Sequence, residues 1–156
     1  MNLLKPISFA LLACILISSC AKEYSSEIAI PRNGIWQFSK GNAQYAGYVQ
    51  SIYVTNGGNS NQLVLLGKSN DGSQTFQLTV YADTIKIGTY KASQFQSSLF
   101  YGTSQIPIYR AGKQYGEFIV NLTKLDSTSI LGNFSGTVQD SSYNSMQITN
   151  GQFQVQ

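Results

Sequence analysis

The sequence contains no histidine, and this absence excludes several kinds of site. Hydrolases that use a Ser-His-Asp or Cys-His arrangement are excluded, and so are zinc, copper and iron sites built on imidazole ligands. Cysteine is almost absent as well, because Cys14 and Cys20 are the only two. Cys14 falls in a segment that we expect to be cleaved off, so the mature chain has no pair of cysteines for a disulfide.

Charged residues make up only 11% of the chain, and they form no run of one sign. Proteins that bind nucleic acid present a clustered basic face, so we predict no nucleic-acid partner. Polarity comes instead from Ser, Thr, Asn, Gln and Gly, and the chain has 10 tyrosines. This composition is typical of an exported protein built of β-strands.

Long apolar runs are missing except near the N-terminus, where Pro6 to Ile17 carries no charged residue. At about 12 residues this run is too short for a membrane-spanning helix, which takes about 20. Lys5 precedes it, as in an export signal. The segment that follows, Leu16-Ile17-Ser18-Ser19-Cys20, resembles the lipobox read by lipoprotein signal peptidases. We therefore predict a signal peptide over residues 1–19 and a lipid on Cys20 that anchors the mature protein to a membrane.

Two alternatives to this cleavage site stay open. One is an ordinary small-residue cleavage site with a chance cysteine. The other is cleavage before Cys14, which would leave an unusually short apolar stretch and an apolar new terminus.

From the lipidated Cys20 to residue 33 the apolar residues follow no clear period. We therefore expect a flexible tether over residues 20–33 and a folded domain over 34–156. Lys22-Glu23 is similar to the short Lys-acidic signal that sends some Bacteroidota lipoproteins to the cell surface. The predicted location is the outer membrane, with periplasmic and surface-facing orientations both open.

Within the domain, apolar residues alternate with polar ones, which predicts β-strands. The clearest case is Gln74 to Tyr81, which follows the hairpin signal Asp71-Gly72. A two-residue turn there pairs Leu63 with Val80, Leu65 with Leu78 and Gly67 with Phe76. Further strands are expected at 36–39, 45–55, 85–91, 94–101, 116–122, 128–138 and 145–155. Ile106 to Tyr109 contains a proline, which predicts an edge strand or a loop.

Nine or ten short antiparallel strands predict a single all-β domain. Each strand has one apolar face, so the strands must pack as two sheets or close on themselves. We favour a β-sandwich, and a small closed β-barrel is the alternative.

The C-terminal segments Thr128 to Val138 and Ser145 to Val155 carry a G-x-F-S-G-T-V and an I-T-N-G-x-F pattern. With these patterns the domain resembles a family of Bacteroidota lipoproteins to which no activity is assigned. The resemblance implies a secreted all-β domain and nothing further about function. Physically, glycines that alternate with bulky residues along residues 130–138 indicate core packing where another backbone comes close, with a ligand groove as the alternative.

Asn150-Gly151 interrupts the last of these segments. Apolar positions are even before it and odd after it, so something shifts the phase of the strand. A two-residue hairpin and a bulge both do this. A hairpin would leave two arms of about four residues, which are marginal alone. We predict one long strand with a bulge in which Gly151 is left-handed, and with Ile148 and Phe153 in the core.

For catalysis, only a carboxylate pair of the glycosidase kind or a serine with a lysine base remains. A glycosidase needs two carboxylates about 5 to 10 Å apart. The candidates are Asp71, Asp83, Glu117, Asp126 and Asp140, of which Asp71, Asp126 and Asp140 stand in turn sequences. Neither Asn70-Asp71-Gly72 nor Asp140 with Asn144 supplies enough oxygens for calcium. We therefore predict no enzyme, no metal site and no cofactor.

Tyrosines on strand positions suggest an exposed aromatic surface that binds glycan or peptide. The candidates are Tyr45, Tyr48, Tyr53, Tyr101, Tyr109 and Tyr115. The alternative is that tyrosine is simply a good strand former. The sequence thus predicts a lipid-anchored envelope protein that acts as a non-catalytic binding module. A structural or assembly component of an outer-membrane complex, with a protein partner, is the alternative, and a glycosidase is the least favoured.

Two further segments, Asp83-Thr84-Ile85 and Asp126-Ser127-Thr128, are similar to the acceptor sequence of Bacteroidota O-glycosylation. Thr84 and Ser127 are the candidate acceptors. Ordinary turn chemistry is the alternative for both.

Overall fold

The computed structural model describes residues 34–55, 61–103 and 105–156. The predicted signal peptide, Cys20 and the tether lie outside these ranges. The described chain contains ten strands and two short 3-10 turns. They are β1 (Gly34–Lys40), β2 (Ala43–Thr55), β3 (Asn61–Ser69), β4 (Thr75–Ala82), β5 (Gly88–Lys91), η1 (Ala92–Gln94), β6 (Ser97–Gly102), β7 (Pro107–Ala111), η2 (Lys113–Tyr115), β8 (Phe118–Leu125), β9 (Ile130–Asp140) and β10 (Ser145–Val155). No helix in these ranges is long and apolar enough to cross a membrane.

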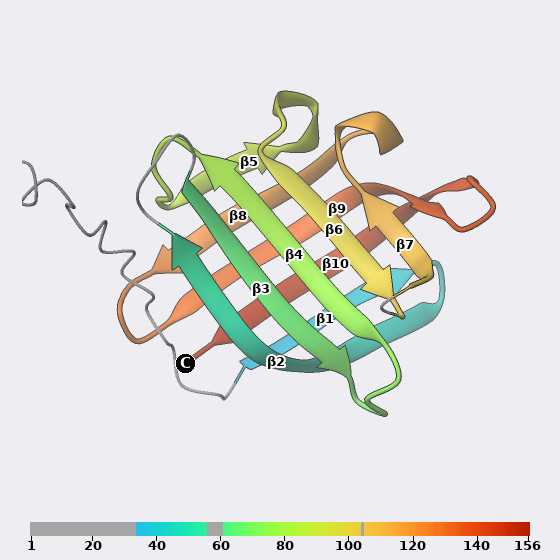
Figure 1. Cartoon of the computed structure of the whole chain (residues 1–156), viewed down its shortest axis with the longest axis horizontal. Helices are drawn as coiled ribbons and strands as arrows, with labels where there is room; N and C mark the ends of the chain where they lie inside the picture. Colours follow the sequence, from blue (N-terminus) through green and yellow to red (C-terminus); the bar gives the residue numbers. More distant parts are fainter. Residues whose placement is uncertain (1–33, 56–60, 104) are drawn as a thin grey trace, which may run out of the picture.

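The sheet closes on itself (Figure 1). The strand order is β10-β1-β2-β3-β4-β6-β7-β9, and β9 pairs again with β10. Because β5 and β8 lie outside this ring, eight of the ten strands form an antiparallel barrel. The all-β antiparallel domain is confirmed. The favoured sandwich is corrected to the barrel alternative, because β10 pairs with β9 along its length and with β1 from Thr149 to Val155, which leaves no open edge between β1 and β9.

Strands β7 and β8 share one edge of β9. β7 pairs with β9 only at Tyr109 and Arg110, whereas β8 pairs with the stretch from Ile130 to Gly136. The short β5 pairs with β8. Two strands thus succeed each other along β9, and the turns beside them, η1 and η2, contact each other.

The barrel interior is filled by aromatic rings. Trp36 stacks on Phe76 with ring centroids 4.4 Å apart, and Phe134 lies 5.8 Å from Phe76 and 6.1 Å from Phe118. Gly47 and Gly67 lie against the indole of Trp36, where a Cβ at either position would overlap it. An eight-stranded barrel is just wide enough to be filled by side chains or to hold one small ligand. Here the side chains fill it.

The hairpin of β3 and β4 has the predicted register. Leu63 pairs with Val80, Leu65 with Leu78 and Gly67 with Phe76. The turn is longer than the two residues expected, because the N–H of Ser69 donates to Gln74 O at 3.0 Å and the N–H of Gly72 donates to Ser69 O at 2.8 Å. Residues 70–73 therefore form the turn inside the Ser69–Gln74 hydrogen bond, and the register is the same.

Strand β7 departs from the expectation of an edge or loop. It pairs with β6 on one side and β9 on the other. Pro107 is the first residue of β7 and lies at a shift in register opposite Gly102. At that position its missing N–H interrupts no regular ladder, so a proline is compatible with a strand inside the wall.

Strand β10 runs unbroken from residue 145 to 155, with a register shift between Ile148 and Gly151. The predicted bulge is confirmed, and Ile148 and Phe153 are both buried. The left-handed residue is Asn150, with φ of 53°, and not Gly151 as predicted. Asparagine tolerates this conformation because its short polar side chain can bond locally. Gly151 serves a different purpose, since a side chain there would strike Phe134.

The glycines of β9 also serve packing. Gly132 faces Phe153 and Gly136 faces Phe118 across neighbouring strands, and each leaves room for the facing residue. Ile130, Phe134 and Val138, which alternate with these two glycines, are buried. Core packing, rather than a ligand groove, accounts for this alternation.

Candidate functional site

The turns η1 and η2 form a corner of the barrel beside β6 and β7. Phe95 ends η1 with φ of 61°, and its N–H donates to Ala92 O at 2.9 Å. The left-handed conformation costs about 1–2 kcal/mol for a residue other than glycine. Even so, the Phe95 side chain is 67% exposed, so core packing does not explain why this residue is held there.

A lysine from η2 covers one face of the exposed Phe95 ring. The ammonium of Lys113 lies 3.4 Å from the ring centroid. Cation–π contacts at exposed sites contribute about 0.5–1 kcal/mol. The contact connects the two turns and leaves a positive charge at the surface.

Arg110 makes a second contact of this kind on the outer side of β7. Its guanidinium lies 4.8 Å from the Tyr115 ring centroid and 5.1 Å from that of Tyr143. Nε of Arg110 is buried and has no hydrogen-bond partner among the described residues. The planar guanidinium is thus held by aromatic rings, and its other donor groups form no carboxylate pair with any residue that the structure describes.

Tyr143 stands in the turn between β9 and β10 with φ of 64° and is 71% exposed. Asp140 organises this turn: its Oδ1 accepts from the N–H groups of Ser142 and Asn144, each at 2.9 Å. The hydrogen bonds from Asn144 hold the pKa of Asp140 below its ordinary value. Tyr143 is therefore a second exposed aromatic residue in a left-handed conformation.

A shallow hollow lies beside the turns η1 and η2. It has a volume of about 570 Å³ and is lined by Phe95, Ser98, Ala111, Gly112, Lys113, Gln114 and Tyr115. Ligand sites occupy roughly 300–1,000 Å³. We call Phe95, Arg110, Lys113, Tyr115 and Tyr143 together the aromatic-basic patch.

The sequence matches no family model, no curated protein and no solved structure. The geometry of the patch is therefore the main basis for assigning a site.

The structure separates the six tyrosines predicted to form one binding surface. Tyr101 and Tyr109 are each 5% exposed and Tyr45 is half-buried beside them. The hydroxyls of Tyr45 and Tyr109 are 2.9 Å apart, and Nζ of Lys40 donates to Tyr109 at 3.2 Å. Burial raises the pKa of Tyr45, and raises that of Tyr101 to about 12. These three tyrosines extend the core instead of offering an exposed surface.

The remaining three tyrosines lie on two parts of the surface. Tyr48 and Tyr53 are 44% and 40% exposed on the outer side of β2. Tyr115 lies in η2 against Arg110. Tyr115 is thus the only one of the six in the aromatic-basic patch.

The patch residues that sequence reasoning missed are Phe95, Arg110, Lys113 and Tyr143. Alternation assigns Phe95 to a strand over 94–101, whereas the strand begins at Ser97. The sequence did carry a signal for Tyr143. It lies inside the turn sequence Asp140 to Asn144, where the tendency of tyrosine to form strands does not explain its presence. No signal in the sequence brings these turns together.

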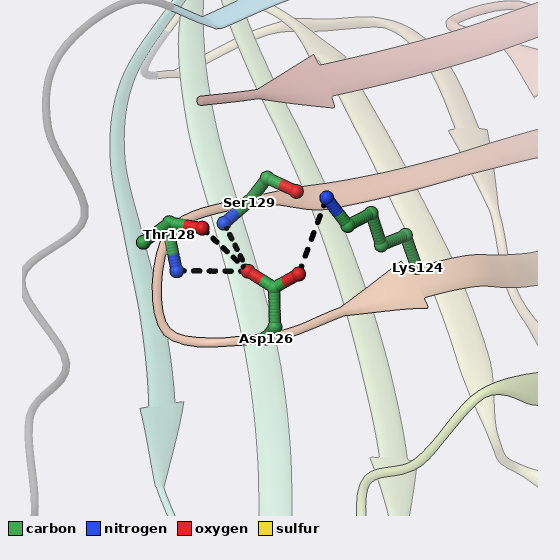
Figure 2. Close-up of polar contacts among 4 residues, drawn as sticks. All are labelled: Lys124, Asp126, Thr128 and Ser129. Carbon is green, nitrogen blue, oxygen red and sulfur yellow. Dashed lines mark hydrogen bonds and ion pairs between the residues drawn. The ribbon is translucent and has the colours of Figure 1, made fainter.

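Asp71, Asp126 and Asp140 stabilise turns, as their sequence context predicts. Figure 2 shows Asp126 accepting from the N–H of Thr128 at 2.9 Å, from its hydroxyl at 2.8 Å and from the N–H of Ser129 at 2.7 Å. Lys124 lies 3.2 Å from the other carboxylate oxygen. These bonds, first of all those from Thr128, lower the pKa of Asp126. Its carboxylate is occupied in the β8–β9 connection.

The predicted glycosylation acceptors are accessible. Thr84 lies between β4 and β5 and Ser127 between β8 and β9, and both are exposed. Cys20 lies outside the described residues. Within those residues, no three Asp, Glu, His or Cys side chains come together in a group that could hold a metal ion.

Proposed function

We propose that this chain is a lipid-anchored envelope protein whose barrel is a non-catalytic module that binds its ligand on the aromatic-basic patch. The observation that carries the proposal is the pair Phe95 and Tyr143, both exposed and both left-handed. Residues held in unfavourable conformations without a packing reason concentrate at functional sites. A glycan or a peptide is the ligand class that an exposed aromatic surface suits.

The packed interior of the barrel supports an external site. The rings of Trp36, Phe38 and Phe76 occupy the region where a small barrel would hold a ligand, and each is at most 1% exposed. A ligand would have to displace stacked rings to enter. The outer surface is the place that remains for binding.

The arrangement of the chain also suits an anchored binding module. In Figure 1 the start of β1 and the C-terminus lie at the lower left, and the connections between β5 and β6 and between β7 and β8 lie at the top. Gly34 pairs with Val155 at that lower end. A tether to a lipid on Cys20 would therefore begin on the side away from η1 and η2 in this view. This suits an outer-membrane lipoprotein of either orientation.

The test is binding by the full-length mature lipoprotein, purified in detergent, to a panel of envelope glycans and peptides. We expect Phe95→Ala and Tyr143→Ala each to weaken binding by about tenfold, as loss of an aromatic anchor does. Tyr53→Ala is the matched control, because Tyr53 is an exposed aromatic residue on β2, outside the patch. It should bind as the parent protein does.

Two results would overturn the proposal. One is ligand binding that the patch variants leave unchanged. The other is a stoichiometric protein partner, captured from the native envelope, that the Phe95 and Tyr143 variants still hold. That second result would assign an assembly role that uses another surface.

A further inference from the structure

We propose that the ligand of the aromatic-basic patch is an anionic carbohydrate whose sugar units carry carboxylates. The inference rests on the proposed binding function and deepens it. Lys113 lines the hollow, and the guanidinium of Arg110 lies against Tyr115, which also lines it. Both cations contact aromatic rings. Among the described residues the salt bridge that forms is Lys124 with Asp126, on the β8–β9 connection.

Arg110 is prepared to receive an anion. Tyr115 and Tyr143 hold its guanidinium, and buried Nε has no partner in the described chain. A guanidinium presents donors in a planar fork that matches a carboxylate. Fixing the fork with two rings before the ligand arrives lowers the ordering cost of binding. The acidic side chain of the β9–β10 turn, Asp140, already accepts bonds from Ser142 and Asn144.

The rest of the hollow suits a sugar. Phe95 offers an exposed ring, and the apolar C–H face of a pyranose packs on such a ring as any apolar group does. Ser98 and Gln114 add a hydroxyl and an amide to the lining. The Gln114 amide donates to the hydroxyl of Tyr115, which orients both groups. Polar groups beside an aromatic floor can serve the hydroxyls of a sugar.

A peptide that binds by strand addition would need a different surface. In that mode an extended peptide adds a strand to a free sheet edge. The strands beside the hollow have no such edge, since β6 pairs with β4 and β7, and β7 pairs with β6 and β9. The patch is formed by side chains alone. It can therefore contact the faces of sugar rings and charged groups, but it offers no unpaired backbone groups for hydrogen bonds to a peptide strand.

The test compares oligosaccharides of uronic acids with the same oligosaccharides after reduction of their carboxyls, by calorimetry on the full-length mature lipoprotein. We expect about tenfold tighter binding of at least one acidic oligosaccharide at low salt, and a smaller preference at high salt. Lys113→Gln and Arg110→Gln should each remove most of this preference, because each takes one positive charge out of the patch. Lys124→Gln is the matched control, because it removes one exposed cation outside the patch.

The outcomes separate this inference from the proposed function. Patch-dependent binding of the reduced oligosaccharides with no preference for the acidic forms would overturn the anionic ligand and keep the binding module. Tighter binding of an acidic peptide than of any oligosaccharide would also overturn the inference. Because Arg110 is half-buried, the fold of its variant is checked by the emission of Trp36. Lys113→Gln changes an exposed residue and carries the test if Arg110→Gln unfolds.

Discussion

Gly151 of β10 lies directly opposite Phe134 of β9, and an added Cβ at residue 151 would come within 2.5 Å of the Phe134 ring. Overpacking of this kind costs about 1–3 kcal/mol. We therefore expect Gly151→Val to lower the free energy of unfolding by more than about 1 kcal/mol in urea titrations. The cause is the clash with Phe134, since the left-handed residue of the bulge is Asn150.

Asn150→Gly is the matched control for this prediction. Glycine adopts the left-handed conformation readily, so this variant should stay within about 0.5 kcal/mol of the parent. A stable Gly151→Val combined with a destabilised Asn150→Gly would contradict this prediction, because it would show that the bulge requires Asn150 and not a glycine at residue 151.

Local pattern was sufficient to predict strand register but not closure. Leu63 and Val80 pair as predicted because the alternation of both strands and the turn between them lie within a short stretch of sequence. Closure depends on Trp36 pairing with Phe153, at opposite ends of the domain. Each strand has the same alternation in a sandwich and in a barrel, so no local feature distinguishes the two.

The candidate site was less predictable than the fold. Tyrosine content suggested an aromatic surface, but it pointed to Tyr101 and Tyr109, whose strand positions face the core. The exposed aromatics of the patch, Phe95 and Tyr143, come from turns. Turns that are distant in sequence become neighbours only through the completed barrel, so spacing could not indicate them.

Acid should weaken the hairpin of β3 and β4. Hydrogen bonds from Ser69 and then Ser73 lower the pKa of Asp71 from 3.8 to about 2. A lowered pKa means that the ionised carboxylate stabilises the fold. This contribution is complete above pH 3.8 and is lost as pH falls toward 2. Asp71→Ala should lower the urea midpoint at pH 7, and the difference from the parent should shrink below pH 3.8.

Asp83→Ala controls for the loss of one exposed negative charge. It should show a smaller change at pH 7. A difference between Asp71→Ala and the parent that stays constant down to pH 2 would show that the carboxylate does not stabilise the turn.

The lipid prediction concerns the two cysteines. Labelled palmitate should be incorporated into the parent chain and into Cys14→Ala, and Cys20→Ala should lose all label, because Cys20 alone remains after cleavage. Gel fluorography of each variant expressed in a bacterium that processes lipoproteins measures this. Label that survives Cys20→Ala would mean cleavage at another cysteine.

The glycosylation prediction concerns two exposed hydroxyls. Thr84 and Ser127 lie in connections between strands, where an attached glycan would meet no packed side chain. We expect intact mass of the native protein to exceed that of polypeptide plus lipid, and Thr84→Ala and Ser127→Ala each to remove one increment. A native mass equal to polypeptide plus lipid would contradict the prediction for both residues.

Alkali should destabilise the barrel through its buried tyrosines. Burial, and next the neighbouring Tyr45, raise the pKa of Tyr101 from 10.0 to about 12. The unfolded chain therefore loses this proton more readily than the folded one, so stability is present below pH 10 and falls as pH rises toward 12. Tyr101→Phe keeps the ring that packs on Trp36, 5.6 Å away, and removes the ionisable hydroxyl. We expect its stability at pH 7 to stay close to that of the parent, with a smaller loss between pH 10 and pH 12 in urea titrations followed by Trp36 emission.

Tyr53→Phe removes a hydroxyl of an exposed residue and should lose stability in alkali as the parent does. An equal alkaline loss in Tyr101→Phe and the parent would show that the ionisation of Tyr101 is not linked to unfolding.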